Sequence, residues 1–387
     1  MSPRDRVPPI QPGEYEKRRL ALGDAIRRAG ASGLLLGPGA SLTYFTGVSW
    51  KPSERFFGCA ISDDGAVRFI CPAFEEPRLR GLFRGNGPSD VATWEEDQSP
   101  FELVAEQLPA TGSNTVLLDP ALPAAFVFAL RDAAPAARFA SGQAAIEAQR
   151  RIKSPAERAL IEAAMQITLS VHRSVHRSLA AGVDTASVKA EIDRLHRERG
   201  ADAGSTFCIV SFGPTTAIAH GSPDVQRLEA GQWVLIDTGC TLHGYHSDLT
   251  RTYVFGEPTD RQRELWSLER QAQLAGFEAA RPGSVCSAID SAARGVLERA
   301  GFGPGYRLPG LPHRTGHGIG LELHESPYFV RGSSDRLEPG VCGSIEPMLA
   351  VPGEAGVRLE DHFYMTDHGP KWFTTPSRSL EEPFAEE

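Results

Sequence analysis

The predicted order of helices and strands repeats itself in the second half of the chain, and this repeat constrains the fold more than any other feature. Hydrophobic spacing, capping residues and glycine breaks predict two helices followed by a strand-rich block, twice in succession. The predicted elements are helices over 154–181 and 185–199, strands within 207–255, helices over 259–280 and 284–300, and strands from there to Phe363. No matching residues accompany the repeat. The pattern favours an architectural duplication, with coincidence in an ordinary α+β domain as the alternative.

The residues before this region follow a different pattern. Short apolar runs bounded by turn residues alternate with helical stretches, which is typical of an α/β domain. A charged helix is expected over 14–30, and the apolar runs cover 34–36, 56–61, 67–71 and 116–118. The alanine-rich stretch 133–145 predicts a domain boundary or a lightly packed edge. We therefore expect two domains, covering residues 1–149 and 150–387.

The composition favours a folded cytoplasmic enzyme or binding protein. The 387 residues include 40 basic and 49 acidic ones, and the net charge of −9 argues against nucleic acid or an anionic membrane as a partner. No stretch approaches the roughly 18 to 20 apolar residues of a membrane span, and the first residues lack the apolar core of a signal peptide. The six cysteines are scattered without a CxxC pair, so nothing indicates thiol catalysis or a cysteine zinc site.

Each strand-rich block contains two acidic residues placed symmetrically about a turn. The pairs are Asp237 and Asp248 about Leu242-His243, and Glu346 and Glu360 about Gly353. A hairpin at each turn would place the two acids opposite each other on one face of a sheet. Carboxylates that close repel, and burying them is costly unless a cation neutralises them. The pairs therefore indicate a metal site, and the alternative is that all four are exposed surface acids.

Histidines cluster in a glycine-rich segment between the two acid pairs. His313, His317 and His324 lie within HRTGHGIGLELHE, and His220 precedes the first pair. Imidazole supplies a nitrogen ligand or a proton carrier near neutral pH, and the glycines allow close approach of backbone and ligand. The segment therefore strengthens the case for a metal or proton-transfer site over isolated structural histidines.

Two other patterns do not support a site. His172 and His176 lie four residues apart on a predicted helix, but no glutamate completes an HExxH zinc motif, so we expect a polar helix face. Gly316, Gly318 and Gly320 do not have the GxGxxG spacing of a dinucleotide-binding loop, and the chain contains neither a Walker A sequence nor a GxSxG motif.

Taken in order, the acid pairs and the histidine segment resemble the metallopeptidase family that includes Xaa-Pro dipeptidase (prolidase) and aminopeptidase P. The matching segments are IDTG, SDLTRT, RTGHGIGLELHE, SIEP and GVRLED, with Tyr44-Phe45-Thr46-Gly47 and RRIKSPAE resembling the smaller domain and the linker. The resemblance implies an α+β chain, with a pita-bread catalytic domain at the carboxy terminus. A smaller, creatinase-like α/β domain would precede it.

The resemblance also implies a set of metal ligands. Asp237, Asp248, His317, Glu346 and Glu360 would hold two divalent ions, with Asp248 and Glu360 bridging. An oxygen-rich set with a single imidazole favours Mn²⁺, with Co²⁺ and Zn²⁺ as alternatives. A hydroxide held between the ions would attack the peptide carbonyl before proline.

Further roles follow from the same resemblance. Glu346 would carry the proton to the leaving nitrogen, while His220 and His324 position the substrate and stabilise developing charge. His313 would lie near the proline side of the substrate. Arg358 would either pair with the peptide carboxylate or serve as a structural partner of the buried acids.

The implied activity is that of an Xaa-Pro dipeptidase acting on small peptides with proline second, in a homodimeric protein. Aminopeptidase P, which removes the first residue from longer peptides, is the alternative and has the same metal centre. A metal-free or non-catalytic binding relative is the alternative of another class. The complete ligand set argues against it, because such a relative has no reason to retain four mutually repelling carboxylates.

The sequence departs from the family at one position. The run Glu346-Pro347-Met348-Leu349-Ala350 ends in alanine where the family usually has tyrosine. A hydroxyl that commonly supports the metal ligands is therefore missing, and loss of such a partner costs roughly 10- to 100-fold in metal affinity or activity. We expect an active enzyme in which another group, such as a water or a nearby hydroxyl, takes this role.

Overall fold

The computed structural model describes residues 3–83, 90–108 and 113–384. The chain divides into two compact units, each described below by itself. The amino-terminal unit covers Ile10 to Arg150. The second unit begins at Arg151 and also includes helix α1 (Pro3–Arg6) and the residues up to Pro9; because it contains all the predicted site residues, it is named the catalytic unit below.

The amino-terminal unit is built on a mixed six-stranded sheet with the order β4-β3-β2-β1-β5-β6. Its strands are β1 (Gly33–Leu36), β2 (Gly58–Ser62), β3 (Val67–Pro72), β4 (Val91–Trp94), β5 (Thr115–Leu118) and β6 (Arg138–Ser141). Its helices are α2 (Pro12–Arg28), α3 (Ala40–Thr46), η1 (Ala73–Glu75), α4 (Glu76–Leu82), α5 (Pro100–Gln107), α6 (Ala124–Ala133) and α7 (Gln143–Arg150). The four apolar runs expected to form strands correspond to β1, β2, β3 and β5, which confirms the α/β assignment. The sequence patterns missed β4 and β6.

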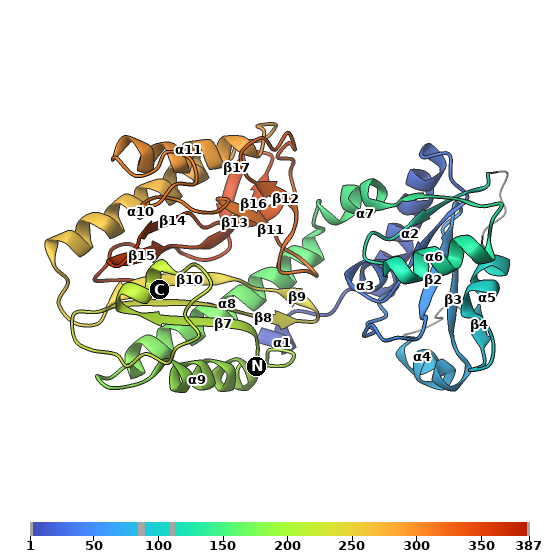
Figure 1. Ribbon diagram of the computed structural model, residues 1–387, viewed down its shortest axis with the longest axis horizontal. Helices are drawn as coiled ribbons and strands as arrows, with labels where there is room; N and C mark the ends of the chain where they lie inside the picture. The colour runs from blue at the N-terminus through green and yellow to red at the C-terminus, as the bar shows by residue number, and fades with distance from the viewer. Residues whose placement is uncertain (1–2, 84–89, 109–112, 385–387) are drawn as a thin grey trace. The chain divides into compact units, whose positions relative to one another are not determined.

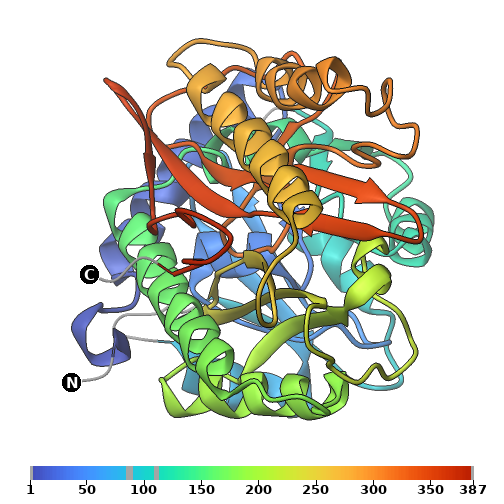
Figure 2. The same cartoon turned by 90° about the vertical axis from the view of Figure 1, so that its left-hand side faces the viewer.

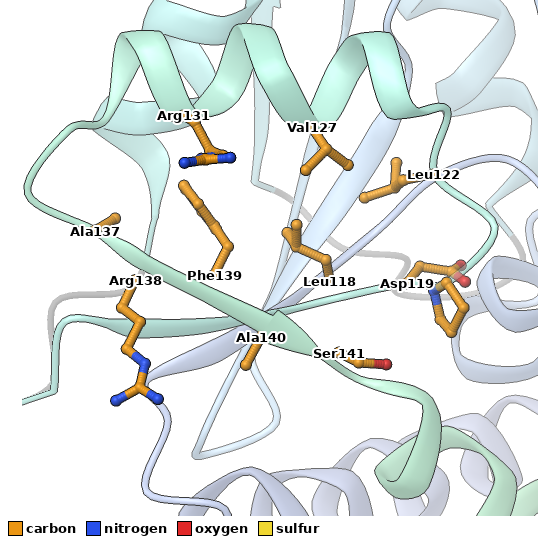
Figure 3. A pocket seen from close by; sticks show the side chains of 11 residues that line it. Leu118, Asp119, Leu122, Val127, Arg131, Ala137, Arg138, Phe139, Ala140 and Ser141 are labelled. Atoms are coloured by element: carbon orange, nitrogen blue, oxygen red, sulfur yellow. The ribbon is translucent and has the colours of Figure 1, made fainter.

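The edge of this sheet at β6 is lightly packed. No residue of β6 is fully buried, which explains why its sequence lacks the alternation of a strand. A cavity of about 630 Å³ lies between α6 and β6, and Leu118, Val127 and Phe139 line it (Figure 3). Of the two alternatives for residues 133–145, the structure shows the lightly packed edge, and the unit ends later, at Arg150.

The catalytic unit contains the predicted helix-helix-strand order twice. The first set is α8 (Pro155–Ser178), α9 (Thr185–Glu198), β7 (Ser205–Phe212), η2 (Gly213–Ala217), β8 (Trp233–Leu242), β9 (Tyr245–His246) and β10 (Leu249–Val254). The second set is α10 (Asp260–Ala279), α11 (Ser287–Arg299), β11 (Gly316–Gly318), β12 (Glu325–Phe329), β13 (Cys342–Ile345), β14 (Met348–Val351), β15 (Ala355–Arg358), β16 (Asp361–Thr366) and β17 (Gly369–Trp372). The leading helix of each set starts with a capping box, formed by Ser154 with Glu157 in α8 and by Thr259 with Gln262 in α10.

The strands of the catalytic unit lie between the two helix pairs, with α8 and α9 on one side and α10 and α11 on the other (Figures 1 and 2). The first set forms the sheet β10-β8-β7, with β9 added to β8, and the second forms the sheet β12-β11-β13-β16-β17. β14 and β15 form a separate two-stranded ladder. A bridge between Thr250 and Glu360 joins the two sets of strands, so the duplicated halves meet at Glu360 and at the ladder partner of Asp237.

The helix α8 carries one unexpected burial. His172 was expected on a polar face, but its side chain is buried and its Nε2 lies 3.0 Å from the carbonyl oxygen of Leu249. Burial lowers the pKa of His172 to about 3, so the ring stays neutral. His176 is half-buried, with its ring against Tyr253 and Phe384. The expectation of a polar face is therefore wrong, and both rings serve packing.

Candidate metal centre

The first pair of acids lies on the hairpin of β8 with β9 and β10. Its two loop residues, His243 and Gly244, have φ of +51° and +83°, as a type I′ turn requires. The ladder pairs Asp237 with Thr250, so the prediction that Asp237 faces Asp248 directly is wrong. The turn is centred one residue later than expected. Asp248 therefore takes the diagonal position, on the same face of the hairpin as Asp237.

Glu346 and Glu360 face each other where two ladders meet. The flanking pairs are Ile345 with Asp361 in β13 and β16, and Met348 with Arg358 in β14 and β15. Both pairs belong to one register, so Glu346 lies opposite Glu360, which confirms the predicted arrangement. The amide of Glu360 donates to the carbonyl oxygen of Thr250 at 3.2 Å, which places this pair against the first hairpin.

His317 enters the centre from β11, between two glycines. A side chain at Gly316 would lie 2.2 Å from a main-chain oxygen of β13, so only glycine allows this close approach. The Nδ1 of His317 lies 3.0 Å from the carbonyl oxygen of Gly318, which assigns the ring proton to Nδ1. Its Nε2 lies 3.0 Å from Oε1 of Glu346 and 3.7 Å from Oδ2 of Asp248, so this nitrogen points to where a cation between the carboxylates would lie.

The buried acids have the electrostatics of a cation site. Burial raises the pKa of Asp237, Asp248 and Glu360, and neighbouring carboxylates add to this effect. Oδ1 of Asp237, Oδ1 of Asp248 and Oε1 of Glu360 are buried and have no hydrogen-bond partner among the described residues. Divalent cations would neutralise the acids and occupy these oxygens. The residues therefore fit a metal centre.

The second oxygens of two of these acids are held in place by neighbouring groups. Arg358 is buried, and its Nη2 donates to Oδ2 of Asp237 at 2.6 Å. The hydroxyl of Thr250 donates to Oε2 of Glu360 at 2.7 Å. Each of these carboxylates therefore has one anchored oxygen and one oxygen available to a cation. This is the supporting arrangement that orients metal ligands in proteins.

Glu346 differs from the other three acids. Burial would raise its pKa, but His317, which lies beside it and hydrogen-bonds to it, together with Arg358 outweighs burial and holds the pKa of Glu346 well below its usual range. Its side chain is 15% exposed, more than that of the other acids in the centre. The hydroxyl of Ser344 donates to its Oε1 at 3.1 Å. Glu346 is therefore an ionised carboxylate at neutral pH that faces the cavity.

Comparison with protein families covers both units. Residues 18–152 match the creatinase/prolidase N-terminal domain, and residues 159–367 match metallopeptidase family M24. The chain belongs to metallopeptidase family M24. Its catalytic unit is accordingly a pita-bread α+β domain preceded by a smaller α/β domain, as predicted.

Individual M24 relatives agree with this assignment over nearly the whole chain. The Xaa-Pro dipeptidase of Lactobacillus helveticus is 34% identical over 345 residues, which cover 88% of this chain and 92% of the relative. The crystal structure of dipeptidase PepE from Mycobacterium ulcerans has a TM-score of 0.87 at 31% identity, covering 96% of this chain and 99% of that one. Recombinant prolidase from Thermococcus sibiricus has a TM-score of 0.84 at 27% identity, covering 93% and 97%. Together with the buried acids, these relatives identify a metal-dependent hydrolase.

Within residues 3–83, 90–108 and 113–384, no helix is both long enough and apolar enough to cross a lipid bilayer.

The M24 metal centre opens into a cavity of about 690 Å³. The cavity is lined by four of the predicted ligands and by all the residues predicted to contact substrate: Asp237, Asp248, Glu346, Glu360, His220, His313, His324 and Arg358. The ring of His324 lies 4.1 Å from that of His317, and burial lowers its pKa to about 4. His313 is also partly buried, and burial lowers its pKa as well. Both rings are therefore neutral hydrogen-bonding groups at neutral pH.

The sequence patterns missed one histidine of this M24 centre. His362 lies in β16, and its side chain is fully buried. One ligand atom each from Asp248, His317, Glu360 and His362 all lie within 4.8 Å of one another. Burial, followed by the effect of His317, holds the pKa of His362 far below its usual value. Its position two residues after Glu360 was the available signal, because alternate residues of a strand share a face.

Proposed function

We propose that the protein is an Xaa-Pro dipeptidase that hydrolyses the peptide bond before proline in small peptides. The observation that carries the proposal is the convergence of Asp237, Asp248, His317, Glu346 and Glu360, with three unpartnered buried carboxylate oxygens, at the wall of a cavity. The names of the relatives, an Xaa-Pro dipeptidase and a prolidase, support this substrate class. The unpartnered oxygens argue against a metal-free binding relative.

These five side chains would hold two divalent ions. When bound, such a pair of ions lowers the pKa of a water to near neutrality and polarises the carbonyl that is attacked. Because four of these five ligands are carboxylates, we propose Mn²⁺ as the native ion, with Co²⁺ and Zn²⁺ as alternatives.

Glu346 is suited to carry the proton. Its carboxylate is ionised at neutral pH and faces the cavity, so it can accept the proton of the attacking water. The same carboxyl group can then donate this proton to the leaving proline nitrogen. Ser344 fixes the orientation of Oε1 during both steps.

The histidines of the cavity are suited to orient the substrate. His324 lies beside His317, and its neutral ring can donate a hydrogen bond to the substrate carbonyl as negative charge develops there. His220 lines the same cavity with an exposed ring. The Nε2 of His313 is buried without a hydrogen-bond partner among the described residues, and we assign it to the proline side of the substrate.

Arg358 is assigned a structural role rather than the binding of the peptide carboxylate. Each nitrogen of its guanidinium already donates a hydrogen bond. Nη2 donates to Asp237, Nη1 to the carbonyl of Ala219 at 3.0 Å, and Nε to the hydroxyl of Thr250 at 3.2 Å. Arg358 therefore compensates the negative charge of the acids and orients Asp237.

The deciding experiment compares hydrolysis of Leu-Pro with that of Leu-Pro-Pro, each with a chelator and with added Mn²⁺. We expect metal-dependent cleavage of the dipeptide, with little cleavage of the tripeptide. Preferential cleavage of Leu-Pro-Pro would reassign the protein to the aminopeptidase P activity. Full activity with chelator, or no cleavage of either peptide by protein loaded with metal, would overturn the proposal.

Two further predictions rest on the resemblance to the family. We propose that the protein is a homodimer and that it acts in the cytoplasm. Analytical ultracentrifugation tests the first, because a dimer would sediment with twice the mass of the chain. Cell fractionation tests the second.

A further inference from the structure

We propose that His362 is a sixth protein ligand of the metal centre and binds the same ion as His317. The proposal rests on the two-ion centre described above and adds a residue to it. One ion position would then have two imidazole ligands, while the position of Asp237 has carboxylates alone.

The strand places His362 on the metal side. In β16 and the residue before it, Glu360 and His362 are two positions apart, so their side chains project to the same face. Asp361, between them, points the other way and forms a buried ion pair with Arg251 at 2.7 Å. The register pairs His362 with Ser344, whose hydroxyl accepts the amide hydrogen of His317 at 3.0 Å. β13 lies between β11 and β16, and the rings of His317 and His362 therefore come within 5.9 Å of each other.

The surroundings of His362 provide an imidazole without a partner. Its ring is fully buried. The backbone of Asp248 lies close to it, but neither Nδ1 nor Nε2 makes a hydrogen bond of good geometry with the described residues. Burying a polar group without a partner is costly, so such groups in native structures call for a bound partner. The ring of His317 lies 5.9 Å away in an edge arrangement, but this contact leaves the nitrogens of His362 unsatisfied.

The four candidate atoms have the spacing of ligands around one ion. Those of Asp248, His317, Glu360 and His362 lie within 4.8 Å of one another, and all four residues are buried. Opposite ligands of an ion are about 4.2 Å apart when each lies about 2.1 Å from it. The cluster therefore needs only small side-chain shifts to enclose a cation.

A second imidazole changes the ions that the centre prefers. Imidazole suits zinc and other late transition ions, whereas carboxylates suit manganese and magnesium. The two positions should therefore differ, with the His317 and His362 position binding Zn²⁺ or Co²⁺ more tightly than Mn²⁺. The preference for Mn²⁺ inferred from a single imidazole then applies to the Asp237 position alone.

The test compares metal-free wild type with His362→Leu, which has a similar volume but no ligand atom. Calorimetric titration with Co²⁺, and the visible absorption of the cobalt protein, report each site without reference to activity. We expect one of the two cobalt sites to weaken roughly 10- to 100-fold, with a changed cobalt spectrum and a smaller change for Mn²⁺. Unchanged cobalt affinities and an unchanged spectrum would overturn the proposal.

Thermal unfolding separates a ligand from a packing residue. If His362 is a ligand, the metal-free His362→Leu protein is at least as stable as wild type, because an unpartnered buried polar group has been removed, and Co²⁺ raises its Tm less. If the ring serves packing alone, the metal-free variant is less stable and the rise with Co²⁺ is unchanged, which would overturn the proposal. His362→Gln repeats the test if the leucine variant does not fold.

Two control variants complete the design. His176→Leu removes a half-buried ring that contacts Tyr253 and Phe384, and it should leave both cobalt affinities unchanged. Asp248→Ala should abolish tight binding of both ions. If Asp248→Ala still binds two ions like wild type, the proposed two-ion centre itself fails. If His362→Leu binds both ions like wild type while Asp248→Ala does not, the centre stands and the sixth ligand fails.

Discussion

The hydroxyl of Thr250 donates a 2.7 Å hydrogen bond to Oε2 of Glu360, across the boundary between the two halves of the catalytic unit. The same threonine is the ladder partner of Asp237 in the first hairpin. The hydroxyl of Thr250 therefore orients Glu360 in the second half, while the backbone of Thr250 pairs with that of Asp237 in the first half. The resemblance to the family implies a tyrosine at the position of Ala350, and Thr250 is a hydroxyl group that supports a ligand in this chain.

Replacing Thr250 with valine tests this role. Thr250→Val keeps the shape but removes the donor, so Oε2 of Glu360 loses its anchor. We expect metal affinity to fall roughly 10- to 100-fold, measured by calorimetric titration with Mn²⁺. Thr238→Val is the matched control, because the Thr238 hydroxyl donates to the carbonyl of Phe207 and not to a ligand. Equal affinities in the two variants would contradict a supporting role for Thr250.

Removing the charge of Asp248 should change how stability depends on pH. Burial and Glu360 raise the pKa of Asp248, so the metal-free native protein binds more protons than the unfolded chain and loses stability as pH rises. Asparagine does not ionise. Metal-free Asp248→Asn should therefore have the higher Tm at pH 8, with an advantage that shrinks toward pH 5. Added Mn²⁺ should reverse the order, because only wild type retains the ligand. An advantage independent of pH would argue against a raised pKa.

The role of Arg358 can be separated by two substrates. Arg358→Lys keeps the charge but loses the fork that reaches Asp237, Thr250 and Ala219. If the role is structural, kcat/KM should fall by the same factor, roughly 10- to 100-fold, for Leu-Pro and for Leu-Pro amide. A loss confined to Leu-Pro would show that Arg358 binds the peptide carboxylate. Arg314→Lys is the control, because Arg314 lines the same cavity but lies over the ring of Tyr328.

A tyrosine at position 350, which the resemblance to the family implies, should be costly to introduce. Ala350 is fully buried within the main apolar core, and its backbone exchanges two 3.0 Å hydrogen bonds with Gly310. Ala350→Tyr should therefore lower the free energy of unfolding by about 1 to 3 kcal/mol through overpacking, as measured by urea denaturation of the metal-free protein. Ala180→Tyr, at an exposed position, should change it little. Unchanged stability in Ala350→Tyr would show that the space for the tyrosine has been kept.

Sequence patterns were most informative where chemistry and periodicity coincide. Glu346 and Glu360 could be placed opposite each other because their turn is symmetric and the strands on both sides share one register. Asp237 and Asp248 are displaced from that arrangement, because the loop uses His243 and Gly244 and moves the register by two residues. Spacing along a sequence does not reveal which residues take positive φ when one of them is not glycine.

The residues that sequence analysis missed lack a local signal. The edge strand β6 is not deeply buried, so its side chains carry no alternation. The position of His362 indicates a ligand only once β16 is known to be a strand. In a turn, a side chain two positions after Glu360 could equally face the other way. Burial also decided the status of His172, whose spacing from His176 suggested a polar face. Each of these depends on packing between segments distant in the sequence.

The bridge between Thr250 and Glu360 also bears on local unfolding. Because ligands come from hairpins in both halves, ions bound there must be released before either hairpin can open independently. Backbone amides of β8 and β15 that exchange slowly in the metal-bound protein should therefore exchange faster when a chelator is added. The exchange rates of the two strands should increase together, although the strands belong to separate ladders. The centre that carries out the chemistry would in this way also make the two halves of the catalytic unit a single cooperative unit.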